Sequence, residues 1–281
     1  MEQIQNNRVI TDLYRENAQF PGIALDGSDV YLCWQRFVDR HDSLMASCRR
    51  GDEVVWEREI SDGGEVLHPV ILAHGGAIWY AWSEYARENW RILARCYRDG
   101  QWGEVLTVAS GEALFFPRLF TWQGKLHVIW TEQHKGSAAA VLCPLTEAGP
   151  GAAETVSVVG EAYRAGAAEG GDGNLYVAYD GFDGKQYKLF ARARTAGWSE
   201  EIVVSQGEDW ASTPWIAAKP DGAVVGWYDY GYMAVYSVRS ADLTVRDGAL
   251  AAVNPQCLKE GVDWYLDLHV ASNSSDLQAM A

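Results

Sequence analysis

The sequence places ionisable side chains at a spacing that recurs along the chain. Two residues after a repeated aromatic position it has Arg36, Glu84, Glu132 and Asp229. Two carboxylates that face one substrate can act as general acid and as base or nucleophile in glycoside hydrolysis, where they lie ~5–10 Å apart. Glu84, Glu132 and Asp229 are therefore the candidate catalytic residues.

A second group of polar residues departs from the repeat. His68, Arg118 and Arg164 each occur where a repeat begins, without a counterpart in the other copies. Arginine binds carboxylates through paired hydrogen bonds and histidine exchanges protons near neutral pH, which suits uronate binding and proton abstraction by a sugar lyase or epimerase. The alternative is that several of these groups form ion pairs at a wet rim. The candidate substrate-binding residues are Arg36, His68, Arg118, Arg164, Asp180 and Tyr230.

A repeat of about 48 residues must position these side chains. In four copies a proline precedes a tryptophan by thirteen residues, as in Pro69 and Trp82. The fourth copy has Gly166 and Tyr179 at these positions, and the last, looser copy begins at Pro255. Each copy holds four short apolar segments separated by turns, and four antiparallel strands every ~45 residues are typical of a propeller blade. The copies begin near residues 21, 69, 117, 166, 214 and 255.

The predicted fold is all-β: one six-bladed β-propeller of four-stranded antiparallel blades, covering residues 1–281 as a single domain. The last copy has room for three strands only. The segment 8–11 aligns with the fourth strand of the other copies, so we expect the N-terminal strand to close the last blade and remove the open edges of the ring. The alternative is five blades followed by a C-terminal tail.

Two turns between the third and fourth segments of a copy carry a family resemblance. The sequences at 98–102, RDGQW, and 195–199, TAGWS, resemble degenerate Asp-box turns of sialidase-like propellers, which have the form Ser-x-Asp-x-Gly-x-x-Trp. The resemblance implies a propeller in which this tryptophan lies between blades. Sialidases begin the first blade with Arg-Ile-Pro, whereas this chain has Gln19, Phe20 and Pro21, so sialidase activity is not expected.

Strand alternation predicts that the candidate residues share one face. If the first strand of a blade runs away from that face, the second strand returns to it, and the next blade begins there. Five copies carry a glutamate shortly before the blade start, and two interpretations stay open for this set: the same local contact in every blade, or a carboxylate rim that binds a cation or polyol. These residues are Glu16, Glu65, Glu112, Glu161 and Glu208.

Composition narrows the classes of partner. The formal charge is 23 − 38 = −15, which argues against nucleic acid and anionic membranes, because both attract clustered lysine and arginine. The chain lacks an apolar run long enough to span a bilayer and an N-terminal signal segment, so we expect a cytoplasmic protein. The histidines and cysteines lack metal-site spacing. We therefore predict no cofactor, with Ca²⁺ in the central channel as the alternative.

Together these patterns predict a carbohydrate-active propeller that binds a glycan or sugar acid at the mouth of its central channel and acts on it as a hydrolase or lyase. A lectin-like binding module is the first alternative, and it requires similar pockets between successive blades. A protein-interaction scaffold is the second, and it requires a broad exposed aromatic patch without a deep pocket. The oligomeric state stays open.

Overall fold

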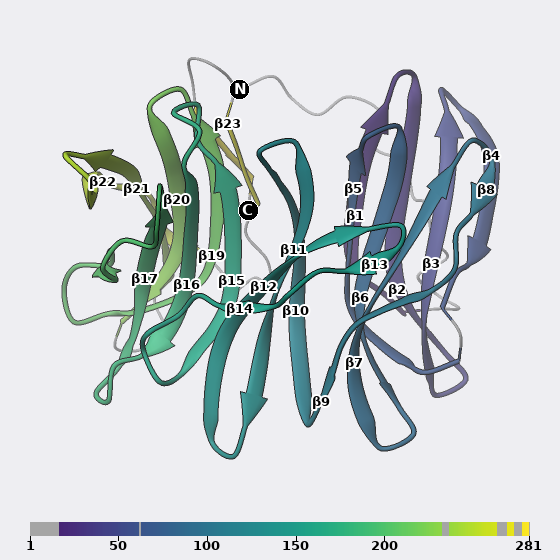
Figure 1. Cartoon of the computed structure of the whole chain (residues 1–281), viewed down its shortest axis with the longest axis horizontal. Coiled ribbons are helices and arrows are strands. Elements are labelled where there is room, and N and C mark those ends of the chain that lie inside the picture. Colours follow the sequence, from purple (N-terminus) through teal and green to yellow (C-terminus); the bar gives the residue numbers. More distant parts are fainter. Residues whose placement is uncertain (1–16, 62, 232–235, 263–268, 273–276, 281) are drawn as a thin grey trace.

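The computed structural model describes residues 17–61, 63–231, 236–262, 269–272 and 277–280, and this part of the chain is all β. Five antiparallel sheets of four or five strands stand side by side in chain order (Figure 1), and we call this array the ring. The outermost strand of the second and third sheets is split into two short pieces. The first three sheets comprise β1 (Asn17–Asp26), β2 (Asp29–Val38), β3 (His41–Arg50) and β4 (Glu53–Glu59); β5 (Glu65–His74), β6 (Ala77–Ala86), β7 (Asn89–Arg98), β8 (Gln101–Trp102) and β9 (Leu106–Gly111); and β10 (Ala113–Trp122), β11 (Lys125–His134), β12 (Ser137–Thr146), β13 (Gly149–Pro150) and β14 (Glu154–Thr155).

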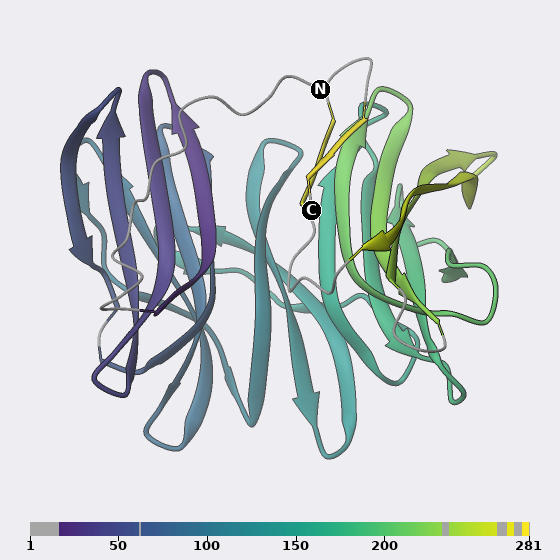
Figure 2. The same cartoon turned by 180° about the vertical axis from the view of Figure 1, so that it is seen from behind.

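The fourth and fifth of the five sheets have four strands each, and a two-stranded sheet follows them in the chain. The short strand β23 lies beside β19 (Figure 2). The strands are β15 (Ala162–Glu169), β16 (Leu175–Phe182), β17 (Tyr187–Arg194) and β18 (Ile202–Val203); β19 (Trp210–Lys219), β20 (Gly222–Tyr230), β21 (Tyr236–Arg246) and β22 (Ala249–Val262); and β23 (His269–Ser272) with β24 (Leu277–Met280).

The architecture confirms the predicted β-propeller of antiparallel sheets. Pro255, where the sequence predicts a sixth copy to begin, lies within β22, which pairs with β21 of the fifth sheet. The predicted closing strand at 8–11 lies outside the described residues. The six-blade count and the closure therefore stay predictions. Among the described residues, no helix has the length and apolarity needed to cross a membrane.

The repeated aromatic residues form the core between sheets. Trp82, Trp130, Tyr179 and Trp227 are all at most 2% exposed. They occur on the second strands, where alternation directs every other side chain to the same face. Burying a side chain of this size contributes about 2–3 kcal/mol or more to stability. This explains why the aromatic position recurs in the sequence.

Each first strand begins four residues earlier than its predicted start, at Asn17, Glu65, Ala113, Ala162 or Trp210. The repeated proline thus lies inside the strand, because a register shift there accommodates a residue that has no N–H group. In all five first strands the shift falls at this level, for example between Leu67 and Val70. From the sequence we expected the four residues before each predicted start to be loops. In the structure they belong to the first strands, which border the centre of the ring.

The residue before the proline has a left-handed backbone in four of these bulges. The φ angles are 50° at Phe20, 54° at His68, 55° at Phe116 and 54° at Thr213. A residue with a Cβ in this region carries strain of ~1 kcal/mol or more, and such strain persists only where the surroundings impose it. The strained residues all lie at the same level of the ring, next to its centre.

Candidate functional site

Two ends of the ring can be distinguished from strand direction. We call the end at which each first strand begins, each second strand ends and each third strand begins the entry end. The opposite end, which carries the turns between third and fourth strands, is the box-turn end. The antiparallel pairing within every sheet places Arg36, Glu84, Glu132, Asp180 and Tyr230 at the entry end, as the sequence predicts.

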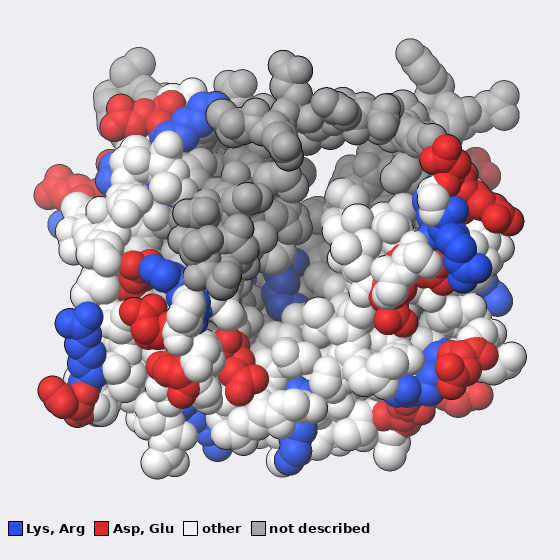
Figure 3. All heavy atoms as spheres, turned by 90° about the horizontal axis from the view of Figure 1, so that it is seen from above, with Lys and Arg blue, Asp and Glu red and all other residues white. Residues whose placement is uncertain are grey.

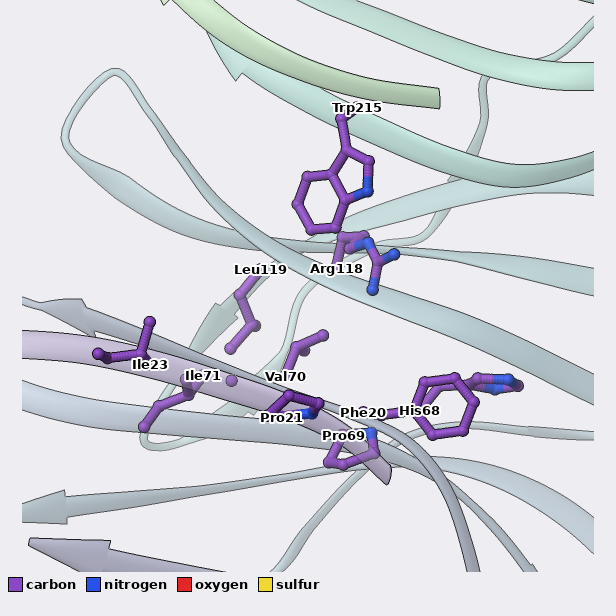
Figure 4. A pocket seen from close by; sticks show the side chains of 11 residues that line it. Phe20, Pro21, Ile23, His68, Pro69, Val70, Ile71, Arg118, Leu119 and Trp215 are labelled. Carbon is purple, nitrogen blue, oxygen red and sulfur yellow. The ribbon is translucent and has the colours of Figure 1, made fainter. Parts of the chain in front are cut away.

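A cavity of about 200 Å³ lies between the first strands. It combines apolar walls with a histidine, an arginine and a tryptophan. His68 and Phe20 lie on one side of it, and Arg118 and Trp215 lie on the other (Figure 4). We call this cavity the central pocket. Its lining residues are Phe20, Pro21, Gly22, Ile23, His68, Pro69, Val70, Ile71, Arg118, Leu119 and Trp215.

His68 is held between two aromatic rings. Its ring centroid lies 4.9 Å from that of Phe20 and 4.2 Å from that of Phe116. The Nδ1 atom of His68 is buried and has no hydrogen-bond partner among the described residues. Burial, together with the nearby positive charges of Arg118 and Arg164, lowers the pKa of His68 to about 3. The imidazole is thus neutral, and its Nδ1 atom is enclosed by the surrounding described residues.

Arg118 stacks on Trp215 across the pocket from His68. The guanidinium carbon lies 4.4 Å from the centroid of the indole ring. A cation over an aromatic face keeps its N–H groups at the edges, where they can still donate to an anion. Seen from above, the described atoms border a hollow in which Lys or Arg atoms are visible (Figure 3). Arg118 thus brings a positive charge to the central pocket, although the chain as a whole carries a net charge of −15.

Arg164 is held in place by the buried carboxylate of Asp180. Its Nη2 donates to Oδ2 of Asp180, and its Nη1 lies 3.1 Å from Oγ1 of Thr213. Asp180 is fully buried, and its Oδ2 also accepts from the backbone N–H of Thr213 at 3.2 Å. Burial raises the pKa of Asp180, while Arg164 opposes that rise. Asp180 thus orients Arg164 and ties the fourth sheet to the bulge of the fifth.

Two of the three candidate catalytic carboxylates occupy matching ion pairs. Glu84 accepts from the indole N–H of Trp82 at 3.3 Å and is paired with Arg91. Asp229 accepts from the indole N–H of Trp227 at 2.9 Å and lies 2.7 Å from Nε of Arg239. The exposed fractions of Glu84 and Asp229 are 0% and 2%. In each case the partner arginine comes from the third strand of the same sheet.

The remaining predicted residues lie apart from the central pocket. Glu132 is exposed on β11. Arg36 binds Glu59 of the outermost strand of the first sheet, with Nη2 and Oε2 3.0 Å apart. The ring centroid of Tyr230 lies 5.6 Å from that of Trp210, with the two rings tilted, and burial raises the pKa of Tyr230. The structure therefore brings His68 and Arg118 together in the pocket, with Arg164 close enough to influence His68.

The repeated glutamates make mostly local contacts. Glu65 accepts from the backbone N–H of Asp42 at 2.9 Å, Glu112 lies 3.0 Å from Nδ1 of His134, and Glu161 accepts from the hydroxyl of Tyr163 at 3.3 Å. Glu16 lies outside the described residues. The three partners differ, namely a backbone N–H, an imidazole and a hydroxyl, so these contacts are not the same in every blade, and the choice between the two interpretations stays open. Among the described residues, no cluster of three histidine, cysteine or acidic side chains could hold a metal ion.

Sequence reasoning missed two aromatic residues that shape the site, namely Phe20 and Phe116. Both precede the repeated proline. The signal was present, because positions adjacent to a proline inside a strand are those at which a bulge redirects side chains. The spacing alone did not indicate that these side chains would reach the centre of the ring.

Comparisons with known proteins support the fold. No protein-family model matches the sequence, and no curated protein matches it. Among solved structures, the chain is similar to a puromycin-hydrolyzing peptidase of Mycobacterium tuberculosis, with a TM-score of 0.59 and 16% identity over 90% of this chain and 38% of that one. The chain thus spans about two fifths of the length of the peptidase.

Two further structures match most of both chains. A subtype N10 neuraminidase-like protein of A/little yellow-shouldered bat has a TM-score of 0.55 and 8% identity, covering 91% of this chain and 85% of that one. An alpha-L-arabinofuranosidase from Lactobacillus brevis has a TM-score of 0.50 and 10% identity, covering 93% and 96%. At these identities the likeness establishes the propeller fold alone.

Proposed function

We propose that this protein is a carbohydrate-active propeller that binds a sugar acid in the central pocket. The observation that carries the proposal is the pairing of a neutral, partly buried His68 with Arg118 across a small cavity. An arginine suits a carboxylate, an imidazole nitrogen suits a hydroxyl, and aromatic walls suit the C–H faces of a sugar ring. Arg164 adds a second positive charge close to His68.

The same geometry favours proton transfer over two-carboxylate hydrolysis. The described lining of the central pocket contains neither Glu84, Glu132 nor Asp229, and the two buried carboxylates are each engaged by an arginine. A bound carboxylate would offset the charges of Arg118 and Arg164 and thereby raise the basicity of His68. His68 is thus our candidate base for proton abstraction next to the acid group, as in a lyase or epimerase. The hydrolytic roles of the three carboxylates stay predictions.

The pocket also bears on the alternatives. A lectin-like module requires similar pockets between successive blades. The described cavities instead differ in position and lining: the central pocket, one at Glu112 and Lys135, and one at Arg50 and Asp99. A scaffold does not require a concave site with a neutral histidine. Both alternatives nevertheless remain outcomes of the experiment.

The test is a thermal-shift titration with galacturonate and glucuronate, with galactose and glucose as neutral counterparts. A ligand that binds only the native state raises the melting temperature with its concentration. We expect the acids to stabilise the wild type, and we expect Arg118→Ala to abolish the shift. Arg36→Ala is the matched control, because it removes an arginine at the entry end that binds Glu59 instead.

Two outcomes would contradict the proposal. Equal shifts with acids and neutral sugars would remove the role of the arginines, and shifts that survive in Arg118→Ala would move the site elsewhere. If none of the four sugars stabilises the wild type, the scaffold alternative gains support. If an acid does bind, product formation would separate an enzyme from a lectin. We expect this product formation to be lost in His68→Gln.

A further inference from the structure

We infer that the ligand is an oligosaccharide chain, with one unit in the central pocket and the following units on a line of aromatic rings that leads out of it over the second and third sheets. This inference rests on the proposed function and extends it from a single sugar acid to a polymer of such units. We call the line the aromatic track. It consists of Tyr85, Trp90, Phe115 and Phe116.

The track is continuous, ring by ring, from the rim to the pocket. The centroid distance is 5.3 Å from Tyr85 to Trp90, 4.6 Å from Trp90 to Phe115 and 6.2 Å from Phe115 to Phe116. Phe116 then contacts His68 at 4.2 Å, and His68 lines the pocket. The rings come from the entry ends of β6, β7 and β10, so three strands of two sheets build one surface.

The bulge in β10 makes this continuity possible. In a regular strand, consecutive side chains point to opposite faces. Phe115 and Phe116 are consecutive, yet their rings are neighbours, because the register shifts at this point and Phe116 has a φ of 55°. The strained residue thus joins the rim to the pocket. Backbone strain of this kind is common at functional sites.

Exposure and pocket size both favour a chain. Tyr85 is 41% exposed at the outer end of the track, and the other three rings are half-buried. The pocket, at about 200 Å³, is smaller than the ~300–1,000 Å³ usual for drug-sized ligands. It has room for one small unit, and the remaining units of a longer ligand would lie on the track.

A second group of rings provides a matched control. Tyr187, Trp210, Tyr230 and Tyr236 are linked at 5.4, 5.6 and 5.5 Å over the fourth and fifth sheets. Trp210 is 41% exposed, as Tyr85 is. The ring contacts found among the described residues connect this group to Tyr163 and Phe182 and not to a ring of the central pocket. It therefore has the composition of the track without its continuity.

The experiment compares ligand lengths. Calorimetry would use galacturonate and its α-1,4-linked oligomers of two, four and six units, and in parallel mannuronate and its β-1,4-linked oligomers. In whichever of the two series binds, we expect the tetramer to bind roughly ten-fold more tightly than the monomer. Trp90→Ala should reduce the gain to two-fold or less, and Trp210→Ala should retain it. Tyr85→Ala, on the exposed end of the track, repeats the test with little risk to folding.

The outcomes separate this inference from the function beneath it. Binding of the monomer without a gain in the tetramer, or an equal loss of the gain in Trp90→Ala and Trp210→Ala, overturns the track and leaves the sugar-acid site intact. If neither monomer nor oligomer of either series binds the wild type, the proposed function fails and the inference fails with it. A tetramer gain that depends on Trp90 and Tyr85 supports both.

Discussion

The two ends of the ring use arginine in different ways. At the box-turn end, Arg95 donates to the carbonyl of Gly103 at 2.8 Å and packs on Trp102 at 5.2 Å. Arg192 makes the same contacts in the fourth sheet. Its Nε donates to the carbonyl of Ser199 at 2.9 Å, and its guanidinium carbon lies 5.3 Å from the ring centroid of Trp198. Both arginines also reach a carbonyl of the preceding sheet, at Ile60 or Val156. These arginines join neighbouring sheets.

The entry end lacks this regularity. Arg118 lies over Trp215 in the central pocket, Arg164 is anchored by Asp180, and His68 has a buried nitrogen without a described partner. The box-turn arginines thus repeat one arrangement in two sheets, whereas His68, Arg118 and Arg164 each have a different environment. Under our proposal, the repeat is broken where the ligand binds. The comparison yields four predictions, in order of decreasing effect.

The largest effect is expected from Trp102→Ala at the box-turn end. Removing this ring deletes its contacts with Trp56, Tyr80 and Tyr97 and the packing surface of Arg95. We expect the free energy of unfolding to fall by about 3 kcal/mol, measured by urea denaturation. At a temperature where the variant is folded, sugar-acid affinity should equal that of the wild type. A loss of affinity in the folded variant would contradict the separation of the two ends.

The next effect concerns the support of Arg164. Asp180→Asn leaves the guanidinium without its charged partner, which should cost about 2 kcal/mol, less than for a fully buried pair because Arg164 is one third exposed. It should also weaken sugar-acid binding about ten-fold, because Arg164 loses its fixed orientation. Asp229→Asn, which breaks the similar pair with Arg239, should cost similar stability and leave binding unchanged. Equal binding losses in the two variants would show that Asp180 has no special role.

The third prediction uses pH. The pKa of native His68 is about 3. Below about pH 6.5 the His68 imidazole is therefore protonated in the unfolded chain but stays neutral in the native protein. The free energy of unfolding should therefore decrease as the pH falls from about 6.5 towards 3, with a slope of at most ~1.4 kcal/mol per pH unit from this group. His68→Gln should remove that part of the slope, as followed by urea denaturation at several pH values.

Two comparisons isolate the histidine. Burial raises the pKa values of Asp180 and Asp229, so these carboxyls contribute slopes of the opposite sign, which cancel when the variant is subtracted from the wild type. His127, near the box-turn end, also has a pKa lowered by burial, so His127→Gln should flatten the profile too. Only the contribution of His68 should shrink when a sugar acid is present. An identical response of both histidines to ligand would argue against a site at His68.

The sequence was sufficient for the fold but only partly for the site. Periodic prolines and tryptophans, with turns between short apolar segments, predicted the propeller because each copy buries the same aromatic side chain. His68, Arg118 and Arg164 were identified because they break that repeat. The pairing of Glu84 with Arg91, by contrast, could not be predicted, because the partner lies on the next strand and its distance depends on register. The position of Phe116 likewise depends on a bulge that residue types do not specify.

The smallest effect is expected from relieving strain at each end. Gln123, in a hairpin at the box-turn end, has a φ of 50°, and Phe20, beside the central pocket, has the same value. Asparagine tolerates this backbone better than other residues with a side chain. Gln123→Asn should therefore stabilise the protein by about 0.5 kcal/mol and leave binding unchanged. Phe20→Asn relieves the same strain but removes the ring against His68, so it should gain no stability and should weaken sugar-acid binding several-fold. Melting temperature and calorimetry measure both. If Phe20→Asn were stabilised without a loss of affinity, the strain at the entry end would be incidental to the site.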